Sequence, residues 1–437
     1  MFKLNHIQFP MKKTARNMMR PTFLVALFQF VLNPCLSGQE EVDKWWRGNL
    51  HTHTLWSDGD DYPEVVAKWY KDNGYHFLAL SDHNIFQNSE RWTSPEKNKG
   101  GVKAMKRYVS TFGDKWVEKR VRNGQTEIRL KTFSEFSDRL SQDGRFLLIP
   151  SEEITARYLT SPIHMNASNL QGVIKPASGE SVLDVMQNNV DLVIQQRKET
   201  GQPILIHLNH PNFGWGVTAE ELMKVEGENF FEVYNGHPSV RNIGDKIHAS
   251  TEKMWDIILT WRLAVLGMKP MYGLATDDSH NYFTESRSAS ITGRGWIMVK
   301  SPKLEPNEII NAIENGDFYA SSGVEIKKMT WEKSKTLSLH PKAEEDEEFT
   351  FTFIGTRKGF DRTNKKIRTT SGDALRITHR YSDDIGEIFQ ITKGKFANYK
   401  PKGDELYMRC LIESNKDMER PLRDGDKKRA WIQPLVF

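Results

Sequence analysis

Short, nearly continuous apolar runs recur between residues 76 and 300, and helical patterns lie between them. The runs occupy residues 76–83, 145–153, 203–210, 230–236, 271–278 and 295–300. Runs of this length are typical of strands that are buried on both faces of a parallel sheet. In residues 181–200, Leu183, Met186, Val190 and Val193 recur at helical spacing. We therefore predict an α/β fold with a parallel sheet, most simply a barrel, over residues 45–324.

Two other segments depart from this alternation. Residues 88–144 are rich in charged side chains, with helical patterns around Trp116 and Phe133. We interpret them as a helical insertion near the site, and a solvated helix pair without function is an equal alternative. After Gly323, short alternating strand patterns separated by polar turns replace the helical ones. They predict a small β-sandwich-like domain over residues 325–437. Structural support is its simplest role, and carbohydrate binding is an analogy only.

The N-terminal segment, residues 1–38, has the pattern of a secretory signal peptide. It carries five basic residues and no acidic one, and the apolar run 22–32 precedes small residues that end at Gly38. The run is too short to span a membrane. We predict export to the periplasm, the cell surface or the medium, with no transmembrane span after cleavage. Translation could start at Met1 or at Met11.

Charge and cysteine content fit an exported protein. Removal of five basic residues takes the formal net charge of the chain from +4 to −1. A basic footprint for nucleic acid is therefore not implied, and we expect no stable nucleic-acid partner. Cys35 lies in the predicted signal, so Cys410 would be alone in the mature chain, without a disulfide.

Residues able to bind metal follow one predicted strand after another. His51 and His53 point to the same side of a strand, at the end where barrels place their active sites. Paired imidazoles there suit Zn, Mn or Fe, although a lone H-x-H pair is more often polar surface. The same residue types recur at the other strand ends, as Asp82, His83, Glu152, Glu153, His164, His207, His210, Asp277, Asp278 and His280. This shared placement is the strongest functional signal in the sequence.

The motifs HTH followed by SDG, then SDHN, EEIT, IHMN, NHPN and DDSH, resemble the PHP (polymerase and histidinol phosphatase) superfamily of metal-dependent phosphoesterases over about residues 46–323. GDFYASSG, residues 316–323, is similar to its secreted members. The resemblance implies a distorted (β/α)7 TIM-like barrel and three divalent metal ions, Zn, Mn or Fe. It implies one ion held by His51, His53, Glu153 and Asp278, a second by Glu153, His164 and His210, and a third by Asp58, His83 and His280.

The resemblance also favours Glu153 over Glu152, and His210 over His207. Asp82 and Asp277 are expected to orient ligand histidines, and simple caps of loops are nearly as good an explanation. The sequence indicates the substrate contacts less clearly than the metal ligands. The candidates near predicted strand ends are Arg157 and Arg294, which come first, and Asn235, His237, Arg287 and Tyr319. An arginine fork matches phosphate oxygens. Trp56 and Trp215 are candidates to line a pocket.

Together these features predict an exported phosphoesterase. It would hydrolyse a phosphate mono- or diester by in-line attack of a metal-bound hydroxide at a trinuclear site. A metal-bound water or His237 would protonate the leaving group. Its partner would be a phosphorylated small molecule or a phosphodiester. The alternative is a metal-containing protein that binds glycan or protein without simple phosphoesterase turnover. A DNA polymerase proofreading module and a histidinol phosphatase are disfavoured by the predicted export.

Overall fold

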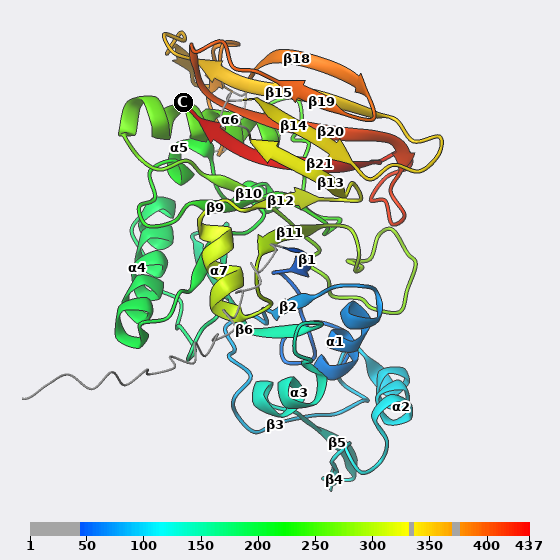
Figure 1. Cartoon of the computed structure of the whole chain (residues 1–437). Coiled ribbons are helices and arrows are strands. Elements are labelled where there is room, and N and C mark those ends of the chain that lie inside the picture. Colours follow the sequence, from blue (N-terminus) through cyan, green and yellow to red (C-terminus); the bar gives the residue numbers. More distant parts are fainter. Residues whose placement is uncertain (1–43, 332–335, 369–375) are drawn as a thin grey trace, which may run out of the picture. The chain divides into compact units, whose positions relative to one another are not determined.

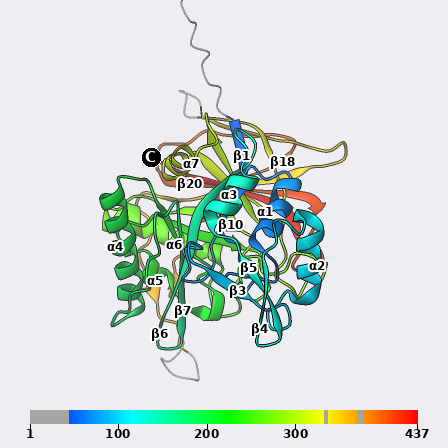
Figure 2. The same ribbon diagram turned by 90° about the horizontal axis from the view of Figure 1, so that it is seen from below.

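The computed structural model describes residues 44–331, 336–368 and 376–437, which all belong to one compact unit. The predicted signal segment, residues 1–38, lies outside them. Among the described residues, no helix combines the length and the apolar character needed to cross a membrane. Figures 1 and 2 show this part of the chain from two directions.

One large sheet carries most of the fold. Its first nine strands in space are β10 (Tyr272–Thr276), β9 (Phe230–Asn235), β8 (Leu205–Leu208), β7 (Ser161–Ser168), β6 (Leu147–Tyr158), β2 (Phe77–Leu80), β1 (Lys44–Asn49), β11 (Trp296–Ser301) and β12 (Phe318–Ser321). The sheet is mixed, whereas the sequence predicted a parallel one. β1, β2 and β6 run parallel, as do β8, β9 and β10, but β7 is antiparallel to both neighbours. A two-residue turn joins β6 to β7, and such a short connection forces antiparallel pairing.

The predicted closed barrel is not seen as a closed sheet. Among the described residues, no strand ladder joins β10 to β1, because β1 already pairs with β2 on one edge and β11 on the other. The chain segments that follow β1 and β10 do contact each other just beyond the ends of these strands. Thr52 and Ser279 form an isolated parallel bridge, and the N–H of Asp278 donates to the carbonyl of His51. The residues that follow β1 and β10 therefore lie side by side.

Helices cover the faces of this sheet (Figure 1). They are α1 (Pro63–Asp72), α4 (Val182–Thr200), α5 (Ala219–Leu222), α6 (Thr251–Trp261) and α7 (Pro306–Glu314), with a 3₁₀ turn at Phe213–Trp215 and a π-helical turn at Arg262–Leu266. α4 begins as its sequence predicts, because the Ser181 hydroxyl accepts a hydrogen bond from the N–H of Asp184. It ends at Gly201, whose φ of 68° suits glycine.

The insertion contains a sheet as well as helices, which corrects the prediction of a purely helical segment. Its elements are β3 (Arg91–Thr93), α2 (Gly101–Phe112), β4 (Lys119–Arg122), β5 (Gln125–Leu130) and α3 (Phe133–Leu140). Asn123 and Gly124 both have positive φ and connect β4 to β5. Asn-Gly with this geometry is a strong hairpin signal, and the reading of the sequence missed it.

The strands of the C-terminal region belong to three sheets. They are β13 (Ile326–Trp331), β14 (Leu337–Pro341), β15 (Phe349–Arg357), β16 (Asn364–Lys365), β17 (Arg380–Tyr381), β18 (Glu387–Gly394), β19 (Ala397–Tyr399), β20 (Glu405–Asp417) and β21 (Lys427–Val436). Phe349, Phe351 and Phe353 alternate along β15 and share a buried cluster with Leu339 of β14. β21 pairs with β12, so β21, β20, β15 and β18 extend the large sheet. The other two are the three-stranded sheet β13-β14-β19 and the two-stranded sheet β16-β17.

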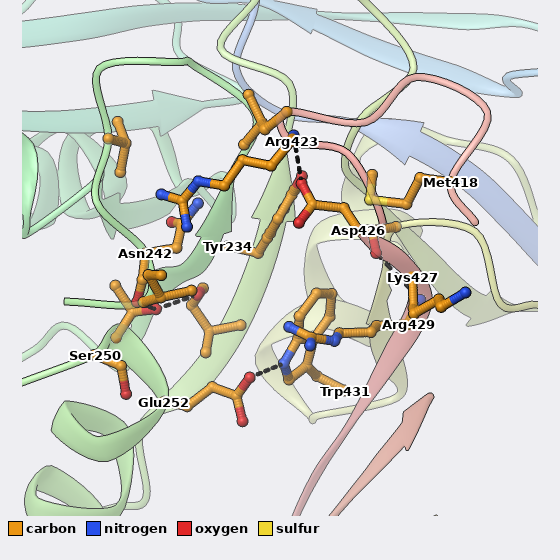
Figure 3. A pocket seen from close by; sticks show the side chains of 16 residues that line it. Tyr234, Asn242, Ser250, Glu252, Met418, Arg423, Asp426, Lys427, Arg429 and Trp431 are labelled. Carbon is orange, nitrogen blue, oxygen red and sulfur yellow. Dashed lines mark hydrogen bonds between the residues drawn. The ribbon is translucent and has the colours of Figure 1, made fainter. Parts of the chain in front are cut away.

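A buried ion pair joins this region to α6. The guanidinium of Arg409 on β20 donates to both carboxylate oxygens of Asp256, at 2.8 and 2.7 Å, and the Tyr407 hydroxyl donates to the same carboxylate at 2.9 Å. All three side chains are buried. Nearby, Trp431 donates to Glu252 at the wall of a cavity of about 360 Å³ between β9, α6 and β21 (Figure 3).

Substitution of Asp256 should test how firmly these regions are held together. We expect Asp256→Ala to lower the free energy of unfolding by about 3–5 kcal/mol, because it leaves the Arg409 guanidinium buried without its partner. Urea unfolding measures the loss. Asp72→Ala, which removes an exposed pair with Lys68, should cost less than about 1 kcal/mol. Equal losses in the two variants would contradict the role given to Asp256.

Candidate metal centre

The nine residues predicted to bind metal come together at one end of the large sheet. Glu153 and His164 lie within β6 and β7, whereas the others follow β1, β2, β8 or β10. All nine belong to one network of short contacts: His51, His53, Asp58, His83, Glu153, His164, His210, Asp278 and His280. The bridges between residues 52 and 279 and between residues 83 and 153 hold the strand ends together.

Glu153 lies at the centre of this network and is buried. The distances from its Oε1 atom to the nearest ring nitrogens are 3.0 Å for His164, 3.5 Å for His51 and 3.6 Å for His210. The distances from its Oε2 atom are 2.7 Å for His83 and 3.4 Å for His53. One carboxylate therefore faces five imidazoles.

Two further carboxylates complete the network. The Oδ1 atom of Asp278 lies 3.3 Å from the Nε2 atoms of both His51 and His53. The Oδ1 atom of Asp58 faces three rings, at 3.2 Å from His280, 3.5 Å from His53 and 3.6 Å from His83. The ligand atoms fall into three groups that could each hold an ion: His53, Asp58, His83 and His280; His51, His53 and Asp278; and His51, Glu153 and His210.

Two observations show that these residues fit divalent cations. The Nε2 atoms of His51 and His53 are buried and have no hydrogen-bond partner among the described residues, and such atoms are rare in native proteins. Many of the nitrogen–oxygen distances, 3.2–3.6 Å, are longer than good hydrogen bonds. They match the ligand–ligand edges, roughly 3.3–3.6 Å, of a tetrahedral shell with zinc-like bond lengths.

Charges in the network support the same assignment. Burial lowers the pKa of His51, but the carboxylates of Asp278, Glu232 and Glu153 outweigh burial and raise that pKa well above its usual value. Burial and the neighbouring His280 lower the pKa of His53 to about 3. His53 is therefore neutral at physiological pH, which is the form that binds metal.

Glu232 on β9 is a functional residue that the reading of the sequence missed. Its Oε1 atom lies 2.7 Å from Nδ1 of His51, and its Oε2 atom accepts from the N–H of His210 at 2.8 Å. The first contact turns Nε2 of His51 toward the cluster, as carboxylates commonly do for histidine ligands. A signal was present, because Glu232 is the only charged residue in the apolar run FFEVYN.

Asp82 and Asp277 make no direct contact with ligand histidines, which corrects that expectation. Asp82 reaches His53 only through the Ser57 hydroxyl, which lies 3.4 Å from Nδ1 of His53. Asp82 accepts hydrogen bonds from Thr54, Ser57 and Gln87. Asp277 accepts from the Tyr70 hydroxyl and from the backbone N–H groups of residues 293–295. Both carboxylates hold loops in place, so the alternative explanation was the correct one.

Glu152 and His207, the alternatives to Glu153 and His210 in the sequence, lie outside the ligand cluster. Glu152 points to the other face of β6, where it accepts from the N–H of Ile174 at 2.6 Å. Burial raises the pKa of Glu152 to about 8, so it is largely protonated at neutral pH. His207 is buried 3.6 Å from Glu232 and supports that carboxylate.

Arg294 and Tyr319 cannot serve as substrate contacts in the way the sequence suggested. The guanidinium of Arg294 is buried and donates to four backbone carbonyls, those of Gly236, Arg287, Ala289 and Arg420. These hydrogen bonds stabilise the loops and leave no pair of N–H groups available to bind phosphate. Tyr319 is buried on β12, where its hydroxyl accepts from the N–H of Ile326.

The remaining candidates differ in their surroundings. The ring of His237 packs edge-on to His280, with centroids 5.5 Å apart. Arg157 is exposed on β6, on the same side as Glu153, and has no hydrogen bond or ion pair among the described residues. Asn235 donates to Glu232 and to Asp278, so it supports a predicted ligand. Arg287 pairs with Asp424 at the surface.

Trp56 and Trp215, which the sequence suggested as pocket residues, make other contacts. Trp56 is buried and donates to the carbonyl of Lys131. Trp215 stacks on His248, with ring centroids 3.8 Å apart. Neither arrangement supports the idea that these side chains line the site.

No family model and no curated protein matches the sequence. Solved structures that resemble the fold include a two-domain protein from Bacteroides vulgatus containing a predicted PHP-like metal-dependent phosphoesterase. It is 14% identical, with a TM-score of 0.40 over 90% of this chain and 95% of that one. PsfC from Pseudomonas syringae is 13% identical, with a TM-score of 0.31 over 62% and 88%. A protein from Bifidobacterium adolescentis, proposed to be a metal-dependent phosphoesterase, is 12% identical, with a TM-score of 0.30 over 53% and 87%.

Glu232→Gln should weaken metal binding by roughly 10–100-fold, because His51 loses the carboxylate that fixes its ring. A titration of Zn²⁺ against a competing chelator measures the affinity. Glu228→Gln is the matched control, since burial raises the pKa of Glu228 to about 8 and keeps this carboxyl neutral. The same affinity in Glu232→Gln and wild type would contradict the role of Glu232.

Glu152→Gln should make stability less dependent on pH. Folding raises the pKa of Glu152 from its usual 4.5 to about 8, so between these values the folded state binds more protons than the unfolded state. This group therefore stabilises the fold at low pH, and its contribution falls by up to about 1.4 kcal/mol per pH unit as the pH rises toward 8. Urea unfolding at pH 5 and pH 8 measures the difference. If the change between the two pH values is as large in Glu152→Gln as in wild type, the prediction is wrong.

Proposed function

We propose that this chain is a metal-dependent phosphoesterase of the PHP superfamily. The observation that carries the proposal is the convergence of nine residues around Glu153, with two buried histidine nitrogens that have no hydrogen-bond partner among the described residues. The contacts of these nitrogens with the carboxylate oxygens of Asp278 and Glu153, at 3.3–3.5 Å, are too long for good hydrogen bonds and suit ligand atoms that share a cation. The three ligand groups favour three ions, although they share His51 and His53.

Divalent cations at such a site supply Lewis acidity, which activates water and neutralises charge on phosphoryl oxygens. The residues of the chain do the remaining work. Asp278 and Glu153 keep the site anionic and buried, so that it selects cations. Arg157 offers an unpaired guanidinium that can bind phosphoryl oxygens. His237, beside His280, is placed to give a proton to a leaving group.

The proposed substrate is a phosphate mono- or diester outside the cytoplasm. Export rests on the pattern of residues 1–38 alone. It would direct the enzyme toward phosphorylated small molecules or phosphodiesters in the periplasm, at the cell surface or in the medium.

Hydrolysis of a chromogenic aryl phosphate and of the matching diaryl phosphate tests the function. Wild type with bound metal should hydrolyse at least one of them, and His51→Ala and His210→Ala should each lose about 100-fold or more, because each removes a ligand. His340→Ala on β14, which belongs to the separate three-stranded sheet β13-β14-β19, should retain activity. Circular dichroism checks that the variants are folded.

Full activity in His51→Ala or His210→Ala would contradict the assignment of the site. A wild-type protein that contains metal but hydrolyses neither ester would instead favour the binding protein that the sequence left as the alternative.

A further inference from the structure

The insertion docks on the turn that carries Asp58. Gly100 packs so closely on this turn that a Cβ atom would lie 2.3 Å from the carbonyl oxygen of Asp60. Arg107 on α2 donates to Asp61 at 2.8 Å, and the Tyr108 ring stacks on Tyr62 with centroids 4.2 Å apart. α2 accordingly lies beside α1 in both views (Figures 1 and 2). The insertion is therefore fixed against the cluster.

This docking brings Lys99 to the open edge of the cluster. Its Nζ atom lies 3.3 Å from Oδ2 of Asp58, whereas Oδ1 of the same carboxylate faces the three histidines. The side chain of Asp58 is 38% exposed, the largest value among the nine predicted ligands that appear in ion pairs. That of Lys99 is 60% exposed, and Asp58 is its only hydrogen-bond or ion-pair partner among the described residues. The ammonium group thus lies on the exposed side of Asp58.

The position of Lys99 affects which substrates fit, both through their charge and through the space that they need. A phosphate monoester carries close to two negative charges at pH 7, since its second pKa is about 6, and a diester carries one. A monoester also has three terminal oxygens, so one can reach the ammonium group while others face the ligand cluster. A diester replaces one of these oxygens by a second alcohol arm, which an ammonium group at this edge would obstruct.

We propose that Lys99 contacts the phosphoryl group of the substrate and makes the enzyme selective for phosphate monoesters over diesters. This inference rests on the proposed function. It assigns to the insertion the role of a specificity element, because the insertion supplies the lysine and the packing that places it.

Kinetics on the two chromogenic esters test the inference. Lys99→Ala should lower kcat/KM for the monoester by about tenfold or more, which is the size of effect expected for a charge-assisted contact. The value for the diester should not fall, because the substitution also removes the obstruction to the second alcohol arm. Lys99→Arg should retain most of the preference, because it keeps the charge. Lys103→Ala, an exposed lysine of α2, should change neither value.

Calorimetry provides a readout that does not need turnover. Inorganic phosphate and dimethyl phosphate are titrated into metal-loaded wild type and Lys99→Ala, with metal content measured in both. We expect Lys99→Ala to weaken binding of inorganic phosphate by about tenfold and of dimethyl phosphate by less than about twofold, at unchanged metal content.

Equal losses for both anions, or a loss of metal, would show that Lys99 only supports Asp58, and would overturn the inference. No change for either anion would also overturn it. A wild type that hydrolyses neither ester yet binds phosphate through Lys99 would contradict the proposed hydrolase and leave the assignment of Lys99 standing, so the two failures can be told apart.

Discussion

The carboxylate of Glu153 is the point on which the arrangement depends. Five histidines from four strands or their ends lie within 3.6 Å of it. Burial alone raises the pKa of a carboxyl group, but the surrounding histidines outweigh this and hold the pKa of Glu153 well below its usual value. Such an anion is stable only if positive charge gathers around it, from imidazolium groups or from metal ions. Metal binding and folding should therefore be coupled in this protein.

A frame of hydrogen bonds behind the cluster sets the directions of its side chains. Asn209 donates to Oε1 of Glu153 and to Asn166, while Glu232 faces His51. These groups come from neighbouring strands, so the register of the sheet fixes their spacing. The C-terminal strands reinforce this frame from behind, since Trp431 of β21 stacks on Tyr234 of β9 and donates to Glu252 at the start of α6 (Figure 3).

The sequence allowed the cluster to be anticipated better than the sheet around it. Strand ends and residue type are local features, and together they singled out residues such as His210 and Asp278. Sheet closure is not local, because it depends on which strand takes the free edge of β1, and β11 does so. The role of Arg294 could not be predicted either, since two of its four carbonyl partners, those of Gly236 and Arg420, come from distant segments. Glu232, the lone charged residue of an apolar run, and the Asn123–Gly124 dipeptide were local sequence signals that could have been recognised.

The most direct test of this account is an anomalous difference map from crystals grown with Mn²⁺ or Zn²⁺. The account predicts anomalous peaks among the three ligand groups, with Nε2 of His51 and Nε2 of His53 each facing a peak at about 2.0–2.2 Å. A map without peaks there, in which these two nitrogens are hydrogen-bonded to water or to other side chains, would contradict a metal centre at this site.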